Sequence, residues 1–206
     1  MSNQPRFDAS AGIAIGPILF VLALLAILAA VMAAGNGDFQ VAAGADRITA
    51  DTVAQANVIR NTINECNLQY TLSVSTGSIN PTTDPYPLSN TSTGTLVSAL
   101  VCDPTGTGSL WGAILLPPPT MGFNAWMYID SSGNGGGRCI WSSPSTSNPS
   151  SNSQVTTGLT RAATKFNSST AYSASTEVIY NPASASQKFI VWITQPTGTA
   201  NSNCLP

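Results

Sequence analysis

The stretch AGIAIGPILFVLALLAILAAVMAA, residues 11–34, governs the interpretation of the whole chain because it contains no charged side chain. As an α-helix rising about 1.5 Å per residue, it would be about 36 Å long, enough to cross a bilayer. A secretory signal peptide is the competing interpretation, but its apolar region usually covers only about 7 to 15 residues behind a basic stretch. Here the run is longer and only Arg6 precedes it. We therefore predict an apolar transmembrane or filament-core helix over residues 11–34.

Small residues recur along this predicted helix, beginning with a GxxxG motif and continuing as spaced alanines. Such surfaces let helices approach one another closely, although small residues are also common in any alanine-rich span. The predicted helix-packing positions are Gly12, Gly16, Ala23, Ala26 and Ala30. Pro17 lies inside the span and should kink the helix or mark its true start.

Residues 35–70 form a second, more polar segment that follows an interruption at Gly35, Asn36 and Gly37. Its apolar residues recur at steps of three or four, which predicts an amphipathic stalk helix. The stripe could lie along a sheet or along neighbouring helices. The stripe contains Val41, Ala45, Ile48, Thr52, Ala56, Ile59, Ile63, Cys66 and Tyr70, and the expected polar face carries Asp46, Asp51, Gln55, Arg60 and Asn64.

Beyond the stalk, residues 71–206 are expected to form a β-rich globular head, while residues 1–10 are a short tail. The apolar runs in the head are short, β-branched or aromatic, and are separated by Gly, Pro, Asn and Ser clusters, which is typical of strands and turns. The turn-rich sequence DSSGNGGG should join 123–129 to 138–141 as a hairpin. A short helix is expected near 159–166. The predicted strands are 70–75, 95–102, 110–116, 123–129, 138–141, 177–180 and 188–194.

The four cysteines, Cys66, Cys102, Cys139 and Cys204, are widely spaced and include no CxxC pair. This spacing argues against a zinc or redox site and favours two disulfides. Three pairings are possible. We favour Cys66 with Cys102 and Cys139 with Cys204, because each pair closes its own section of chain, but spacing alone does not decide the pairing. Disulfides indicate an oxidising compartment outside the cytoplasm.

Composition argues against most catalytic and nucleic-acid-binding functions. Only 8% of the residues are charged, the net charge is −2, and there is no histidine. The chain therefore offers no cationic surface for phosphates and lacks the commonest general base and metal ligand. Asp130, Ser132 and Asn134 resemble the opening of a calcium loop, but Trp141 occupies the twelfth position, where an acidic residue is needed. We expect no enzyme activity, no cofactor, no metal and no nucleic-acid partner.

The order of these parts, a short tail, an apolar helix running into an amphipathic one and a β-rich head with a late cysteine, resembles type IV pilins and pseudopilins. The resemblance covers the whole chain as an architecture. It implies an α+β fold in which a long N-terminal helix packs on an antiparallel head, and it implies Cys139–Cys204 as the C-terminal disulfide. The chain departs from the family at the processing site, because a cut after Gly12 would put Pro17 at the fifth position, where the family has glutamate.

The function expected from this resemblance is that of a structural subunit of an extracellular pilus-like filament. The expected partner is the chain itself, as a helical homopolymer. The subunit would lie in the inner membrane before assembly and in the filament, at the cell surface, afterwards. The alternative is a single-pass, membrane-anchored surface adhesin or virion membrane protein that presents its Ser/Thr/Asn-rich head to a surface receptor.

Overall fold

The computed structural model describes residues 15–73, 86–87, 89, 93–103, 108–112, 116–132, 135–145 and 152–206. The side chains of residues 15–17, 31–39 and 71–73 lie outside the described set, as does the predicted tail, 1–10. The chain divides into two compact units, Met1–Ala42 and Ala43–Pro206. The described part of the second unit contains a mixed six-stranded sheet, the C-terminal part of one long α-helix, a second α-helix, short 3-10 helices and two disulfides, so the α+β class is confirmed.

Helix α1 covers Ile15–Ser73. The interruption predicted at residues 35–37 is wrong, because these residues are helical. Two glycines cost a helix roughly 1 kcal/mol each, which the cooperative extension of long flanking helices can offset. The strand predicted at 70–75 is also wrong over residues 70–73. Tyr70 follows Cys66 by one helical turn, and its ring packs 5.2 Å from that of Tyr86, which favours continuing the helix.

From Ala43 onward, α1 belongs to the same compact unit as the sheet. The predicted apolar stripe is buried there, with Ala56, Ile59 and Ile63 fully inaccessible to solvent. These residues pack with Tyr128, Ile140, Phe189 and Val191 of the sheet in one core cluster. Of the two placements left open by the sequence, the stripe in this unit therefore lies along the sheet.

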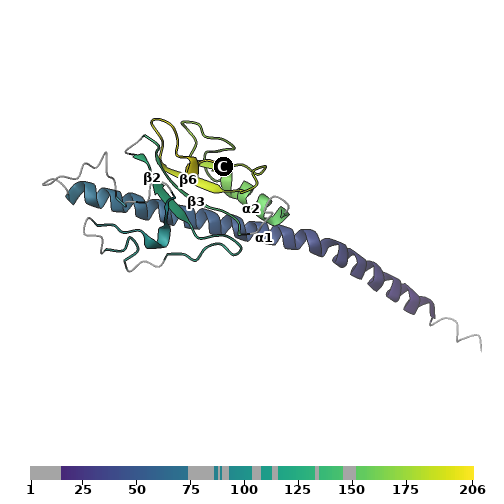
Figure 1. The fold of residues 1–206 in the computed structure, drawn as a ribbon. Coiled ribbons are helices and arrows are strands. Elements are labelled where there is room, and N and C mark those ends of the chain that lie inside the picture. The colour runs from purple at the N-terminus through teal and green to yellow at the C-terminus, as the bar shows by residue number, and fades with distance from the viewer. Residues whose placement is uncertain are drawn as a thin grey trace, which may run out of the picture. The chain divides into compact units, whose positions relative to one another are not determined.

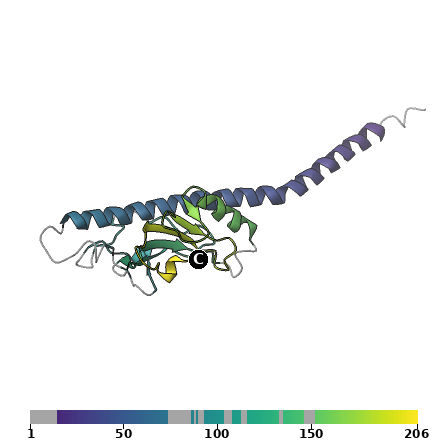
Figure 2. The same cartoon turned by 90° about the horizontal axis from the view of Figure 1, so that it is seen from above.

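The sheet has the strand order β1-β2-β3-β6-β5-β4. Successive side chains along its strands belong to opposite faces of the sheet. One face packs against α1 and α2, Ser153–Ala163 (Figures 1 and 2). The other face carries Ile129, Cys139, Ile190 and Trp192 in a second cluster. This alternation follows from the two-residue period of a strand. The strands are β1 Thr95–Leu96, β2 Met127–Asp130, β3 Arg138–Ser142, β4 Ser168–Ser169, β5 Val178–Tyr180 and β6 Phe189–Thr194.

Three predicted strands agree with β3, β5 and β6 to within one residue. The strand predicted at 123–129 is confirmed only over residues 127–129 of β2, because Phe123 forms only an isolated bridge to Pro144 and 124–126 are not in a strand. The other predicted strands differ more. The strand predicted at 95–102 shortens to β1 and a 3-10 helix, Val97–Ala99. Residues 110–112 of the strand predicted at 110–116 form a turn, and 113–115 lie outside the described residues. The fully antiparallel head is wrong at one edge, because β4 pairs with β5 in parallel. Its two serines give no strand signal, and β4 is defined by its pairing with β5, next to which Glu177 N donates to Asn167 O at 2.7 Å.

The predicted hairpin is confirmed, with β2 and β3 antiparallel and Asp130 opposite Arg138. At Gly137, in the glycine-rich connection between β2 and β3, the backbone requires glycine. Its φ is +76°, and a Cβ there would lie 2.8 Å from both Pro196 N and Thr194 O. Any side chain would therefore combine left-handed backbone strain with a clash against the backbone that follows β6.

Helix α2 covers Ser153–Ala163 and starts before the helix predicted at 159–166. Asn152 caps it, with its side-chain oxygen accepting bonds from Gln154 N and Val155 N at 3.1 and 3.3 Å. The surrounding serine-rich sequence hides this start, because asparagine and serine are equally typical of loops.

Gly158 brings α2 close to α1, and replacing it tests that contact. A Cβ at Gly158 would lie 2.8 Å from Ile48 Cβ, and Thr49 Oγ1 donates to Gly158 O at 3.0 Å. We expect Gly158→Ala to lower the free energy of unfolding by about 1 to 3 kcal/mol, as overpacking usually does. Urea titration would measure the change. Ser153→Ala, at an exposed position of the same helix, should change it by less than about 0.5 kcal/mol.

Burial of Tyr180 makes stability sensitive to alkaline pH. Burial raises the pKa of its phenol from 10.0 to about 12. The phenol hydroxyl donates a hydrogen bond to Gln187 Oε1 at 3.3 Å. The folded state therefore holds a proton that the unfolded state loses first. The stabilisation is complete below pH 10 and should be lost as the pH rises towards 12. Urea titrations at pH 9 and 11.5 should show a smaller loss for Tyr180→Phe than for wild type; an equal loss would contradict this assignment.

Candidate functional site

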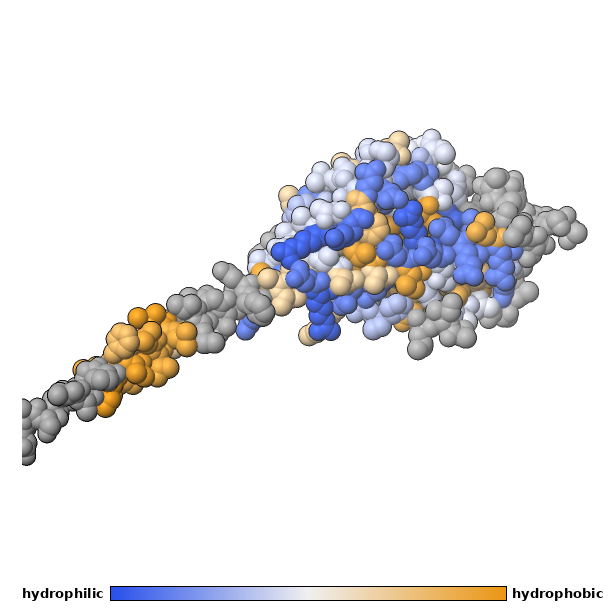
Figure 3. Space-filling view, turned by 180° about the vertical axis from the view of Figure 1, so that it is seen from behind, coloured by the Kyte–Doolittle hydropathy of each residue, from blue (hydrophilic) through white to orange (hydrophobic). Residues whose placement is uncertain are grey.

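The described apolar part of α1, residues 18–30 (the 18–30 segment), is exposed at every position. Figure 3 shows it as hydrophobic across the face in view. Its large side chains leave 51 to 67% of their surface accessible. A helix that is apolar on all sides normally lies in a core or an apolar solvent. The large exposed residues are Ile18, Leu19, Phe20, Val21, Leu22, Leu24, Leu25, Ile27 and Leu28.

The predicted helix-packing positions fall partly in this segment. Ala23, Ala26 and Ala30 are exposed on α1, at spacings that place them on one side of the helix. Gly16 and Pro17 lie within α1, but their side-chain positions are outside the described set, as is Gly12 altogether. Packing of these positions against another helix stays a prediction.

Within the described part of the chain, we find no helix with both the length and the hydropathy needed to cross a membrane. The predicted span, 11–34, includes residues 11–14, which lie outside that part.

The two disulfides join Cys66 to Cys102 and Cys139 to Cys204, which are the pairs favoured from the sequence. They lie on opposite faces of the sheet. The first belongs to the cluster that contains α1 and the second to the cluster beneath Trp192. The second pair also ties the C-terminal 3-10 helix, Ser202–Cys204, to β3.

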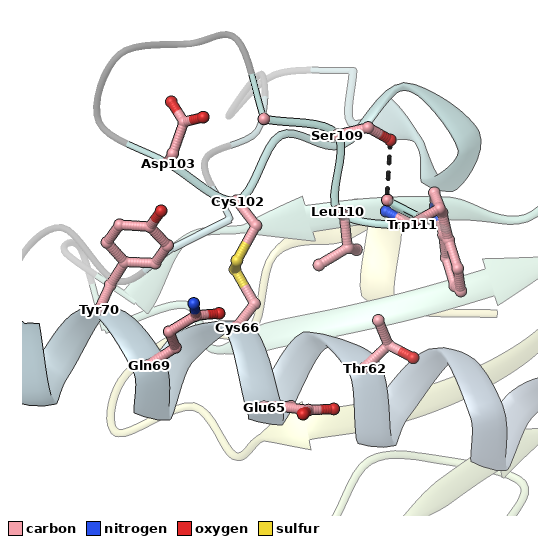
Figure 4. Close-up of a pocket in the computed structure, with 12 residues that line it drawn as sticks. Thr62, Glu65, Cys66, Gln69, Tyr70, Cys102, Asp103, Ser109, Leu110 and Trp111 are labelled. Atoms are coloured by element: carbon pink, nitrogen blue, oxygen red, sulfur yellow. Dashed lines mark hydrogen bonds between the residues drawn. A yellow bond between two sulfur atoms is a disulfide. The ribbon is translucent and has the colours of Figure 1, made fainter. Parts of the chain in front are cut away.

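A polar pocket of about 340 Å³ surrounds the first disulfide. Figure 4 shows the disulfide crossing from α1, with Tyr70 and Asp103 on one side and Leu110 and Trp111 on the other. Glu65 and Asp103 contribute carboxylates, and among the described residues the lining includes no Lys or Arg. Desolvation, with the Asp103 carboxylate and Tyr86, raises the pKa of the Tyr70 phenol. The lining is therefore a hydrogen-bonding, acidic surface.

Sequence reasoning missed a second cavity, the α1–α2 groove, of about 560 Å³. Three residues of α1, Ala50, Val53 and Ala54, make up its apolar lining, here called its floor, and an ion pair between Arg161 and Asp46 also lines it. A usable signal was present in the sequence, because Ala50 and Ala54 lie one helical turn apart beside the buried stripe. The lining residues are Asp46, Thr49, Ala50, Val53, Ala54, Arg161, Thr164 and Lys165.

Gln55, assigned to the polar face, is instead 5% exposed and forms the centre of a buried hydrogen-bond cluster. Its amide nitrogen donates to Pro118 O at 2.7 Å, and its oxygen accepts from Trp126 Nε1 at 2.8 Å. The prediction that Gln55 lies on the exposed polar face is wrong. Its partners are 63 and 71 residues away in the sequence, so the helix pattern around Gln55 gives no sign of them. Both ends of the Gln55 amide are hydrogen-bonded to protein groups inside the core, so its role is structural.

The calcium-loop residues are occupied by protein contacts. Asp130 Oδ1 accepts from Ser132 N at 2.9 Å, and Oδ2 lies 3.5 Å from Arg138 Nε. Asn134 lies outside the described residues. No group of three or more acidic or cysteine side chains suited to a metal ion occurs among the residues described.

No family model, curated protein or solved structure matches this chain. The chain's own candidate surfaces are the 18–30 segment, the α1–α2 groove and the disulfide pocket.

Proposed function

We propose that this chain is the structural subunit of an extracellular pilus-like filament, in which the N-terminal helix mediates assembly and the β-rich head forms the outer surface. The pilin-like arrangement, a long helix packed on a disulfide-linked head, is part of this proposal. The main partner is the chain itself, with the inner membrane as the environment before assembly.

The observation that carries the proposal is that every residue of the 18–30 segment is exposed. Burying one large apolar side chain contributes about 1.5 to 3 kcal/mol. The segment contains nine such side chains. A surface of this kind is rare on a monomeric soluble protein and marks an interaction site. Copies of the same helix, or lipid before they assemble, would provide the apolar contacts that the segment lacks.

Two further features support the proposal. Only 8% of the residues are charged, so copies repel one another weakly. Two disulfides fit a subunit that works outside the cytoplasm.

Electron microscopy of sheared surface material, combined with mass analysis of the recovered chain, tests the function. We expect regular filaments made of this chain, and the N-terminal mass would identify the first residue of the mature subunit. Recovery only as a detergent-extracted monomer, with no filaments, would refute the proposal.

One observation favours the alternative, a membrane-anchored surface adhesin or virion membrane protein. The disulfide pocket offers carboxylate, amide and hydroxyl groups beside Tyr70, which suits a polar receptor group. Under this alternative, the detergent-extracted monomer would bind the host surface without forming filaments, and Tyr70→Ala with Glu65→Ala would weaken that binding.

A further inference from the structure

The α1–α2 groove is an apolar surface whose neighbouring charges are partly balanced. Its floor consists of Ala50, Val53 and Ala54, of which both alanines are exposed. Arg161 is paired with Asp46, so this arginine does not require an acidic partner from outside. Lys165 can turn its ammonium group to solvent while its alkyl stem extends the apolar surface. An uncharged helix could therefore lie on the floor without burying an unpaired charge.

The 18–30 segment has the complementary properties. It carries no charged residue, and all of its side chains are exposed. Ala23, Ala26 and Ala30 give one side of it a low profile, matched by Ala50 and Ala54 in the groove. Small residues on both helices allow a close backbone approach, and the cavity of about 560 Å³ gives room for side chains of the incoming helix.

We propose that the α1–α2 groove binds the 18–30 segment of a second copy of this chain. This inference rests on the proposed filament function and assigns a receptor surface for the assembling helix. The two surfaces are different parts of the same molecule, so the contact is heterologous. Repeated heterologous contacts that do not close into a ring generate an open helical polymer. Each groove would therefore bind the 18–30 segment of another copy, and this contact would extend the filament.

Cysteine cross-linking tests this contact because none of the four native cysteines is free. The full-length chain would carry Ala26→Cys and Ala54→Cys together, and assembled material would be oxidised with copper phenanthroline. We expect an intermolecular 26–54 disulfide, identified by peptide mass spectrometry, and a ladder of covalent oligomers on a non-reducing gel. The matched control pairs Ala26→Cys with Ala185→Cys, an exposed alanine outside the groove lining.

The outcomes separate this inference from the proposed function. Filaments with at least ten times more 26–54 than 26–185 cross-link would support it. Filaments in which the two yields are equal, or the 26–54 disulfide is absent, would overturn the groove contact and leave the filament function standing. A detergent-extracted monomer that forms neither filaments nor cross-links would overturn both and indicate lipid as the partner of the segment.

A charge substitution gives a second, independent test. Ala54→Glu changes an exposed residue, so the near-ultraviolet circular dichroism of the head should match that of wild type. We expect the sedimentable polymer to fall at least ten-fold, because a carboxylate would be buried beneath the apolar segment. Ala185→Glu should leave polymer yield within two-fold of wild type. Normal polymer from Ala54→Glu would overturn the groove contact.

Discussion

Replacing Cys139 and Cys204 together with alanine should lower the free energy of unfolding by about 4 kcal/mol. The bond joins residues 65 positions apart, and the chain-entropy estimate for a loop of this length is about 4 kcal/mol. Both cysteines are fully buried, so alanine also removes packed sulfur atoms beneath the sheet. Urea unfolding of the detergent-solubilised full chain, followed by near-ultraviolet circular dichroism, would measure the loss.

The same double variant should loosen the C-terminal segment. Asn201 Nδ2 donates to Ser131 Oγ at 2.7 Å, and Thr197 N donates to Gly135 O at 3.0 Å, so this segment crosses back to the β2–β3 connection. Without the disulfide, these exposed or half-buried hydrogen bonds must hold it alone, and limited proteolysis should cut it faster. A stability loss below about 1 kcal/mol would show that these contacts suffice without the bond.

Arg138→Met should cost about 3 to 5 kcal/mol of unfolding free energy, because it leaves the buried Asp130 carboxylate without its cation. Arg138 is 2% exposed and lies opposite Asp130 in the hairpin. Its Nε donates to Tyr128 Oη at 2.9 Å and its Nη2 to Tyr86 O at 2.9 Å. One guanidinium group thus joins three residues, and methionine keeps its approximate volume but none of these bonds.

A double-mutant cycle isolates the ion pair. Asp130→Asn removes the carboxylate charge, so the double variant Arg138→Met/Asp130→Asn should lose less than the sum of the two single losses. Arg47→Met is the matched control, because Arg47 pairs with Asp51 on the exposed surface, at 3.7 Å, and should cost less than about 1 kcal/mol. Additive losses in the cycle would mean that the buried charges do not stabilise each other.

Local patterns were sufficient where neighbouring residues decide the structure. The three-to-four spacing from Ala45 to Cys66 predicted the buried side of α1, and the glycine-rich turn predicted the β2–β3 hairpin. Local patterns were insufficient where a contact with a residue distant in the sequence determines burial or strand formation. Gln55 is polar by composition but buried by bonds to residues 63 and 71 positions away. Ser168 and Ser169 become a strand only because β5 lies beside them.

The candidate surfaces divide in the same way. The 18–30 segment follows from a run of uncharged residues, which is visible in sequence order. The α1–α2 groove requires two helices that are brought together at Gly158, where a Cβ would lie only 2.8 Å from Ile48. Helix periodicity shows which side of each helix is apolar, but it does not show how close the two axes will come.

The sequence by itself determined the uncharged N-terminal segment, the α+β class, the alternating strands and an even set of cysteines. These properties depend on residue type and on spacing over a few positions. Only the tertiary structure decided the disulfide pairs, the parallel β4 edge, the burial of Gln55 and the groove between α1 and α2. Each of these depends on which distant segments meet in the folded core, where close packing selects one set of partners.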